Sequence, residues 1–436
     1  MTEQLKLKLN DSKATRWGAL VIVAFTMMAA YYVNDVVAPL KTMLETDLAW
    51  SSTDFGFFTG GYSFLNVFFL MLIWGGLILD RFGIRFTGKL ATILMVGGTA
   101  LEYYAMTGLA GADATLFGIN EIFGYKTGVF VAFAGYSIFG VGAEVAGITV
   151  SKIIAKWFKG KELATAMGVQ VALARIGSQA GYAVAIPLAR AFGISTPVLL
   201  GLVLLLGGMI AFFIFAVMDK KLDKQMEAAA IAAGTEDEEE KFSFKDVKNI
   251  LVNPGFWLIA LLCVLFYSCV FPFQKFASEL MIIKYGINEN VAGTFAGLPA
   301  LGALILTPVF GGFIDKRGKS ASIMLMIILG IAFSLVPSAM WPAVAKIFPV
   351  SQLGTAYALI FFIQNIGLWG IPTLIGWVLD AYCISGKKPD GTNMYDYTVP
   401  MCIFTGIACL SLIVALLLKK ADKKYGYKLE EPNIQK

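Results

Sequence analysis

Two side chains of opposite charge, Glu144 and Arg175, lie in the middle of long apolar runs of this sequence. Glu144 lies ten residues before the end of the run 127–154, and Arg175 lies 13 residues after Glu162, where the next run begins. At 1.5 Å per helical residue these offsets are about 15 and 20 Å, near the middle of a hydrocarbon core about 30 Å thick. A charged side chain there costs at least about 2.5–3.5 kcal/mol, so each one needs a partner or access to water.

The pair has two interpretations. A guanidinium binds a carboxylate bidentately, and a carboxylate accepts hydrogen bonds from an ammonium group, so the two charges could hold the two ends of a zwitterion. The ends of an extended dipeptide are about 7 Å apart at 3.3–3.6 Å per residue, so fixed charges would reject single amino acids and longer peptides. Glu144 and Arg175 could equally form an internal salt bridge that only joins two helices. Their types and positions leave both interpretations open.

The composition excludes several other kinds of chemistry. The chain has 436 residues, of which 58% are hydrophobic and 15% charged, and it contains no histidine. Histidine-bound metals and Ser-His or Cys-His nucleophiles are therefore excluded, and none of the five cysteines forms a CxxC pair. A net charge of +5 is too small to indicate nucleic acid. We expect no enzyme, metal or cofactor, but a membrane protein whose partners are lipid and a small-molecule substrate.

The elements that must position the two charges are membrane-spanning helices of about 20 residues. Eleven apolar runs reach this length, and we expect no cleavable signal peptide. We expect an N-terminal bundle over 1–218, a charged cytoplasmic linker over 219–254, and a C-terminal bundle over 255–436. The eleven runs are 17–40, 55–79, 87–109, 127–154, 162–189, 196–218, 256–283, 290–314, 321–348, 354–381 and 398–418.

Lysine and arginine near the ends of the runs predict the orientation. Four basic residues precede the first run, and the segments after the second and fourth runs are also basic, so the N-terminus and the linker are expected in the cytoplasm. An odd number of spans would place the lysines at 419–424 outside, against this preference. Asn34 and Asp35 lie near the outer end of the first run, either as gate residues or as solvated ones.

A repeat indicates two related halves. The pattern Gly-x-x-x-Asp-Arg/Lys occurs at 76–81 and again at 311–316, and each copy is followed by a Thr-Ala pair. The pair comes 85 residues after the aspartate of the first copy but only 40 residues after that of the second. The second half is therefore one span short of the six that would make two equal halves of twelve spans. Internal repeats are typical of secondary transporters. We expect conformational gating, without substrate contact, from the motif residues Gly76, Asp80, Arg81, Gly83, Arg85, Asp315, Lys316 and Arg317.

Other polar and aromatic side chains are candidates for the substrate site. Asn365 lies ten residues after the second Thr-Ala threonine, as Arg175 does after the first, so the repeat places Asn365 and its neighbour Gln364 toward the centre. Tyr136 is a weaker candidate of the same kind. Interhelical hydrogen bonding explains these residues as well as substrate contact does. Trp341 precedes a proline, which can bend a helix toward a cavity, although packing is the simpler interpretation.

The repeated Gly-x-x-x-Asp-Arg/Lys motif resembles the signature of the major facilitator superfamily. Three stretches resemble the lysosomal dipeptide uniporter family and its bacterial relatives. They are Gly142-Ala-Glu144 with Lys156-Trp-Phe-Lys-Gly-Lys-Glu162, Ala174-Arg175-Ile-Gly-Ser178, and Ala339-Met-Trp341-Pro342 with Gln352-Leu-Gly-Thr-Ala-Tyr357. The resemblance runs from the first span to about residue 381. It implies an all-α membrane protein with the major facilitator fold, two pseudo-symmetric helical bundles and twelve spans, of which eleven can be counted here.

The resemblance also implies that dipeptides are transported by alternating access. In that family a glutamate holds the amino end of the peptide, an arginine holds its carboxylate, and a tryptophan lines the cavity; these roles fall on Glu144, Arg175 and Trp341. Two alternatives stay open: a proton-coupled transporter of small organic anions, with Arg175 as anion site and Glu144 as proton carrier, and a membrane sensor that transports nothing. The expected external loops contain no N-x-Ser/Thr site, which favours a bacterial plasma membrane over a lysosome. An accessory subunit is left open.

Overall fold

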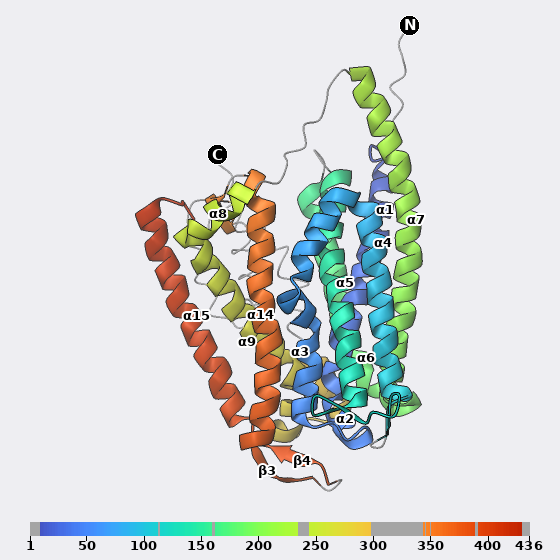
Figure 1. The fold of residues 1–436 in the computed structure, drawn as a ribbon, viewed down its shortest axis with the longest axis vertical. Coiled ribbons are helices and arrows are strands. Elements are labelled where there is room, and N and C mark those ends of the chain that lie inside the picture. Colours follow the sequence, from blue (N-terminus) through green and yellow to red (C-terminus); the bar gives the residue numbers. More distant parts are fainter. Residues whose placement is uncertain are drawn as a thin grey trace.

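The computed structural model describes residues 9–111, 114–158, 162–233, 244–297, 343–344, 346–348, 350–388 and 391–429. Helices make up most of the described chain, as predicted, with two short hairpins, and the elements are labelled as in Figure 1. The elements before the linker are α1 (Lys13–Val36), η1 (Ala38–Leu40), α2 (Lys41–Asp47), α3 (Ser52–Phe68), α4 (Met71–Thr107), β1 (Glu121–Ile122), β2 (Tyr125–Lys126), α5 (Thr127–Trp157), α6 (Leu163–Phe192) and α7 (Thr196–Ala233). The later elements are α8 (Phe244–Val252), α9 (Pro254–Tyr285), α10 (Glu289–Ala296), α14 (Val350–Tyr382), β3 (Ile384–Lys387), β4 (Asn393–Tyr395) and α15 (Thr398–Tyr425).

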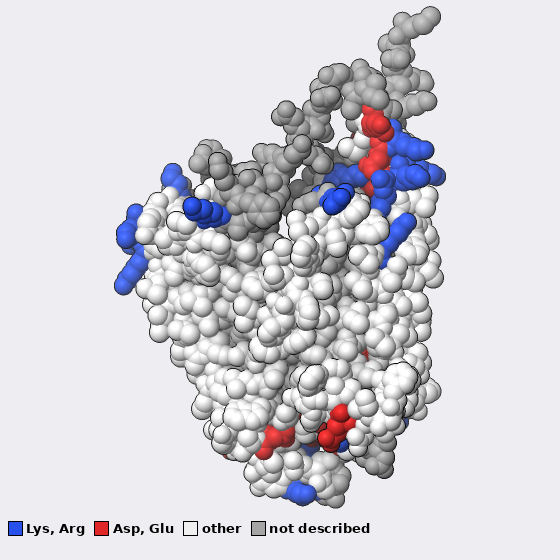
Figure 2. Space-filling view, in the orientation of Figure 1, with Lys and Arg blue, Asp and Glu red and all other residues white. Residues whose placement is uncertain are grey.

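The distribution of charge shows how the molecule sits in a membrane. Six of the described helices are long and apolar enough to cross one, and α3 with the start of α4 forms a bent seventh candidate. Lysine and arginine gather at the end where α7 finishes, and a wide uncharged band separates that end from the opposite one (Figure 2). Helix α15 runs back to the end where α1 begins, so the lysines at 419–424 lie with the N-terminus (Figure 1). The outward-facing lysines that an odd number of spans would require are not observed.

The second predicted span, 55–79, is not one straight helix. Helix α3 ends at Phe68, Leu70 adopts a left-handed conformation with φ 53°, and α4 begins at Met71. The axis bends by 59° at this break. The loop predicted after residue 79 is instead helical, apart from a kink at Gly83, where φ is 75° and ψ is 174°. The prediction was wrong here because an apolar run does not reveal where a helix breaks inside it.

Replacing Gly83 by alanine is expected to destabilise the protein by about 1–3 kcal/mol, because only glycine adopts this backbone conformation readily. A Cβ at Gly83 would meet no atom within 4 Å, so the loss comes from backbone strain and not from a collision. Gly76→Ala is the matched control, since Gly76 also has open space around it but lies in regular helix. Thermal unfolding in detergent should show a lower Tm for Gly83→Ala alone, and equal values for the two variants would contradict the assignment.

The two halves meet at their outer ends, where α3 packs against α14. A Cβ on Gly376 would lie 2.3 Å from the backbone oxygen of Ser52, and one on Gly56 would lie 2.6 Å from that of Pro372, so the two backbones touch. A continuous buried apolar cluster joins the N-terminal core to the outer parts of α9 and α14. The cytoplasmic end of the C-terminal half has a separate cluster around Phe256. The described structure is therefore closed on its outer side.

Candidate functional site

Glu144 and Arg175 lie at similar depths on α5 and α6. Glu144 is 13 residues before the end of α5, and Arg175 is 12 residues after the start of α6, which are about 20 and 18 Å from the cytoplasmic ends. Both side chains are half-buried. Glu144 accepts a hydrogen bond of 3.0 Å from the hydroxyl of Tyr62 on α3. Among the described residues no ion pair within 4.0 Å joins Glu144 to Arg175, so the internal salt bridge is not formed in this state.

Aromatic rings from both halves surround the two charges. The Arg175 guanidinium lies 5.4 Å from the ring centre of Tyr31 on α1 and 6.0 Å from that of Phe271 on α9. Tyr267, one turn from Phe271, stacks on it at 5.1 Å. Tyr31 and Tyr267 each lie within electrostatic reach of both Glu144 and Arg175. The charges therefore lie at the interface between the two halves, where a transporter binds its substrate.

The other predicted site residues form contacts of their own. Gln364 accepts a hydrogen bond of 3.4 Å from a cysteine thiol on α9, and the Asn365 amide donates one of 2.9 Å to the backbone of its own helix. Both side chains are almost fully buried. Tyr136 donates to a backbone oxygen of α1 at 2.8 Å. None of these hydrogen bonds is made to Glu144 or Arg175, and substrate contact by the three residues stays a prediction. Trp341 lies outside the described residues.

The first copy of the repeated motif belongs to an ion-pair cluster within the N-terminal half. Arg85 Nη1 lies 2.9 Å from Asp223 Oδ2, and Lys156 Nζ lies 2.8 Å from Asp219 Oδ1, so these pairs join α4, α5 and the cytoplasmic end of α7. Asp219 is fully buried and also accepts a hydrogen bond of 2.9 Å from the indole of Trp157. The cluster holds three helices of one bundle together. Of the remaining motif residues, Gly76, Asp80, Arg81 and Gly83 lie on α4, with Arg81 exposed, and Asp315, Lys316 and Arg317 lie outside the described residues.

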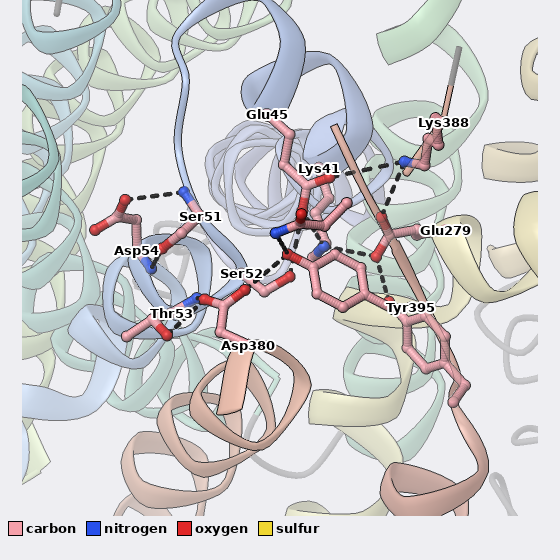
Figure 3. Close-up of polar contacts among 12 residues, drawn as sticks. Lys41, Glu45, Ser51, Ser52, Thr53, Asp54, Glu279, Asp380, Lys388 and Tyr395 are labelled. Atoms are coloured by element: carbon pink, nitrogen blue, oxygen red, sulfur yellow. Dashed lines mark hydrogen bonds and ion pairs between the residues drawn. The ribbon is translucent and has the colours of Figure 1, made fainter. Parts of the chain in front are cut away.

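A buried charge network, here called the outer network, joins the two halves at the outer end. Lys41 of α2 lies between Glu45 of the same helix and Glu279 of α9, with Nζ–Oε distances of 2.5 and 2.6 Å (Figure 3). Lys388 approaches the same two carboxylates at 3.7 and 3.6 Å, and the Tyr397 hydroxyl donates a hydrogen bond to Glu279. Lys41, Glu45 and Glu279 are at most 8% exposed. Two lysines and two glutamates thus neutralise one another away from water.

A second contact fixes the start of α3 to the end of α14. Asp380 accepts hydrogen bonds of 2.5 and 2.6 Å from the backbone nitrogen and hydroxyl of Thr53, and one of 2.7 Å from the hydroxyl of Tyr395 (Figure 3). Thr53 is in the first turn of α3, which a capping box of Ser51 and Asp54 begins. A carboxylate is favourable there because the helix dipole is positive at its N-terminus. Burial raises the pKa of the Tyr395 hydroxyl, which therefore remains a donor at neutral pH.

A third contact lies deeper, between α1 and α9. Lys275 Nζ is 3.2 Å from Asp35 Oδ1 and 3.4 Å from the Tyr136 hydroxyl, and a serine of α6 donates to the other Asp35 oxygen at 2.6 Å. Asp35 is buried, so it is not a solvated residue, and its role as a gate residue stays a prediction. The rings of Tyr136 and Tyr62 are 5.8 Å apart, and Tyr62 binds Glu144. The Asp35–Lys275 pair is therefore connected to the predicted substrate site through two tyrosines.

Sequence reasoning missed the lysines and the glutamate that join the two halves. Lys275 and Glu279 carried a usable signal, because opposite charges four residues apart inside the apolar run 256–283 indicate function. Lys41 and Lys388 carried none, since both fall in segments that sequence alone assigns to loops, where lysines are usually solvated. Only the folded chain brings them to the same carboxylates.

Comparisons with known proteins agree with this architecture. The sequence profile described as Major Facilitator Superfamily matches residues 20–336. The lysosomal dipeptide transporter MFSD1 of Homo sapiens is 28% identical over 450 residues, which cover 95% of this chain and 88% of that protein. MFSD1 of Gallus gallus is 33% identical over 283 residues, covering 57% and 62%. A crystal structure of the peptide transporter POT in complex with sulfate has a TM-score of 0.61 at 14% identity, covering 94% of this chain and 95% of that one. With its membrane-spanning helices in two halves and a profile match over most of its length, this chain belongs to the major facilitator superfamily and has its fold.

Proposed function

We propose that this protein transports dipeptides by alternating access, with the amino end of the peptide at Glu144 and its carboxylate at Arg175. One observation carries the proposal: two half-buried charges of opposite sign lie at the same depth on α5 and α6, with no ion pair between them in the described structure, and Arg175 faces the other half. The similarity to a lysosomal dipeptide transporter supports peptides as the substrate class.

The surroundings of each charge suit a zwitterion. The observed partner of Glu144 is a neutral tyrosine hydroxyl, so the carboxylate retains acceptor capacity for an ammonium group. The guanidinium of Arg175 lies near the rings of Tyr31 and Phe271, and its planar donors match the geometry of a carboxylate. In a site largely shielded from water such charge-assisted hydrogen bonds are stronger than in solution. The rings also provide apolar surface for the side chains of the peptide.

Alternating access requires the two bundles, 1–218 and 255–436, to separate at the outer end. We assign the closure of this end to the outer network, the Asp380–Thr53 contact and the Asp35–Lys275 pair. The Arg85 cluster keeps the N-terminal bundle rigid during the movement, and the conformational gating expected of the repeated motif stays a prediction. We also propose a bacterial plasma membrane as the location, because the external segments lack glycosylation sites.

The test compares ligands that differ only at the amino end. Glu144→Gln should weaken the binding of free dipeptides roughly 10- to 100-fold, the effect of losing a charge-assisted hydrogen bond. It should leave the weaker binding of N-acetylated dipeptides unchanged, because they have no ammonium group. Affinity is measured by calorimetry on the purified protein, after a thermal-shift screen of dipeptides, amino acids, tripeptides and small carboxylates.

Glu227→Gln, at an exposed position of α7, is the matched control and should bind both ligands like the wild type. Equal losses for free and acetylated peptides would indicate that Glu144 has only a structural role. Preferential binding of small carboxylates without an amine would instead favour the transport of organic anions.

A further inference from the structure

Glu102 is a buried carboxyl that the proposed transport site does not use. Its side chain is 0% exposed, and neither of its oxygens has a hydrogen-bond partner in the described structure. It lies five residues before α4 ends at Thr107, which is about 8 Å from the outer end of the helix. A polar side chain this well buried and without a partner is rare in proteins and calls for an explanation.

Close contact between α4 and α5 keeps water from one side of Glu102. A Cβ on Gly135 would lie 2.8 Å from the backbone nitrogen of Glu102, and one on Gly98 would lie 2.5 Å from the backbone oxygen of Gly135. Helices at this separation leave no room for water between them. An ionised carboxylate in such a place costs several kcal/mol, and the carboxyl avoids this cost by holding a proton. Glu102 is therefore neutral in the closed state.

The charged and titratable groups around Glu102 are few. Lys275 of α9 and Tyr136 of α5 lie within its electrostatic reach, and the charge of Lys275 is already balanced by Asp35 of α1 at 3.2 Å. The other helices that pack on α4 carry their charges at its two ends: Asp219 and Asp223 of α7 at the cytoplasmic end, and Asp54 of α3 and Asp380 of α14 at the outer end.

We propose that Glu102 is a proton-binding site that is filled while the outer end is closed and emptied when it opens. This inference rests on the alternating access of the proposed function. Lys275 belongs to the C-terminal half and Glu102 to the N-terminal half, so separation of the halves lets external water reach Glu102 from the side of Lys275. Hydration of the carboxylate must outweigh the loss of the positive charge of Lys275, which favours the ionised form while it is near. Glu102 then releases its proton to that water, and the outer end closes again only after Glu102 has been reprotonated.

The sign of the pH dependence follows from this linkage. The closed state binds one proton more than the open state, so acid favours closure and higher pH favours opening. Glu102 titrates at one pH in the open state and at another in the closed state. Between these two pH values, each pH unit changes the ratio of closed to open molecules by up to tenfold. Glu102→Gln imitates the protonated carboxyl and should keep the outer end closed at every pH.

Distances between spin labels on the two outer hairpins measure this directly. The labels are placed at Glu121→Cys in β1 and Lys387→Cys in β3, both exposed positions, with the exposed Cys402 and Cys409 replaced by alanine. In nanodiscs without substrate, the fraction with a long distance should rise as the pH is raised, by no more than tenfold in the ratio of states per pH unit, as expected for one carboxyl. Glu102→Gln should abolish the rise, whereas Glu227→Gln should retain it.

Dicyclohexylcarbodiimide, which reacts with protonated carboxyls in apolar surroundings, gives a second readout. Mass spectrometry should find its adduct on Glu102 but not on Glu45 or Glu279, which are also buried but paired with Lys41. Any one of three results would overturn the proposal. These are a distance distribution of the wild type that does not change with pH, a pH response of Glu102→Gln equal to that of the wild type, and no adduct on Glu102. Neither readout needs a dipeptide. Both can therefore support the proton site even if dipeptide binding is not found, and dipeptide binding can be found even if both readouts fail.

Discussion

Replacing Arg175 by lysine is expected to lower dipeptide uptake at least tenfold, although the positive charge is kept. A guanidinium donates two parallel hydrogen bonds to a carboxylate, whereas a lysine ammonium is a point charge on a flexible stem. Losing one charge-assisted hydrogen bond costs about 1.5–3 kcal/mol, or roughly 10- to 150-fold in affinity. The contacts of the guanidinium with the rings of Tyr31 and Phe271 are changed as well. Uptake of labelled dipeptide into proteoliposomes measures the effect.

Arg190→Lys is the matched control on the same helix. Arg190 is exposed and pairs with Glu289 at the outer surface, and a surface ion pair of this kind contributes about 0–1 kcal/mol. Its replacement by lysine should therefore leave uptake close to that of the wild type. If Arg175→Lys also transported normally, Arg175 would not be the residue that holds the peptide carboxylate.

Replacing Lys41 by methionine is expected to stop uptake while leaving dipeptide binding intact. In the closed state the substitution removes the cation between Glu45 and Glu279, and breaking a buried ion pair on one side costs about 3–5 kcal/mol. This is more than a hundredfold shift toward the outward-open state, in which the carboxylates can reach water. Parallel binding and uptake measurements separate the two effects, since Glu144 and Arg175 are unchanged.

A second substitution tests whether charge causes the loss. Lys41→Met combined with Glu279→Gln leaves one carboxylate, Glu45, opposite the one remaining lysine, Lys388, so part of the uptake should return. Normal uptake by the single Lys41→Met variant would mean that the outer network does not hold the outer end shut. A loss of both binding and uptake in the single variant would point to misfolding, and a thermal unfolding curve identifies that case.

The helices and the central charges could be predicted because their signals are local. A run of about 20 apolar residues identifies a span on its own, and a charge inside such a run, as at Glu144, stands out without any knowledge of its neighbours. Gly83 was also singled out by its motif, and its positive φ now gives a physical reason for glycine there. The break at Leu70 has no such signal, because leucine is ordinary inside a span.

The outer network could not be predicted because it depends on distant partners. Lys41 and Glu279 are 238 residues apart in the chain, and their pairing requires both bundles to be folded and docked. Glu102 was visible as a carboxyl inside the run 87–109, but only the packing of α5 against it shows that it has no partner. A charge inside an apolar run therefore indicates a structural or functional role at each such position, and the tertiary contacts decide which role it is.

The most direct measurement is an experimental structure of the protein with a bound dipeptide. We expect the ammonium group within hydrogen-bond distance of the Glu144 carboxylate, and the peptide carboxylate in bidentate contact with Arg175, near the rings of Tyr31 and Phe271. A dipeptide bound elsewhere while Glu144 and Arg175 are paired to each other would contradict the proposed function. A dipeptide that lies in the reverse direction would contradict the roles assigned to the two residues.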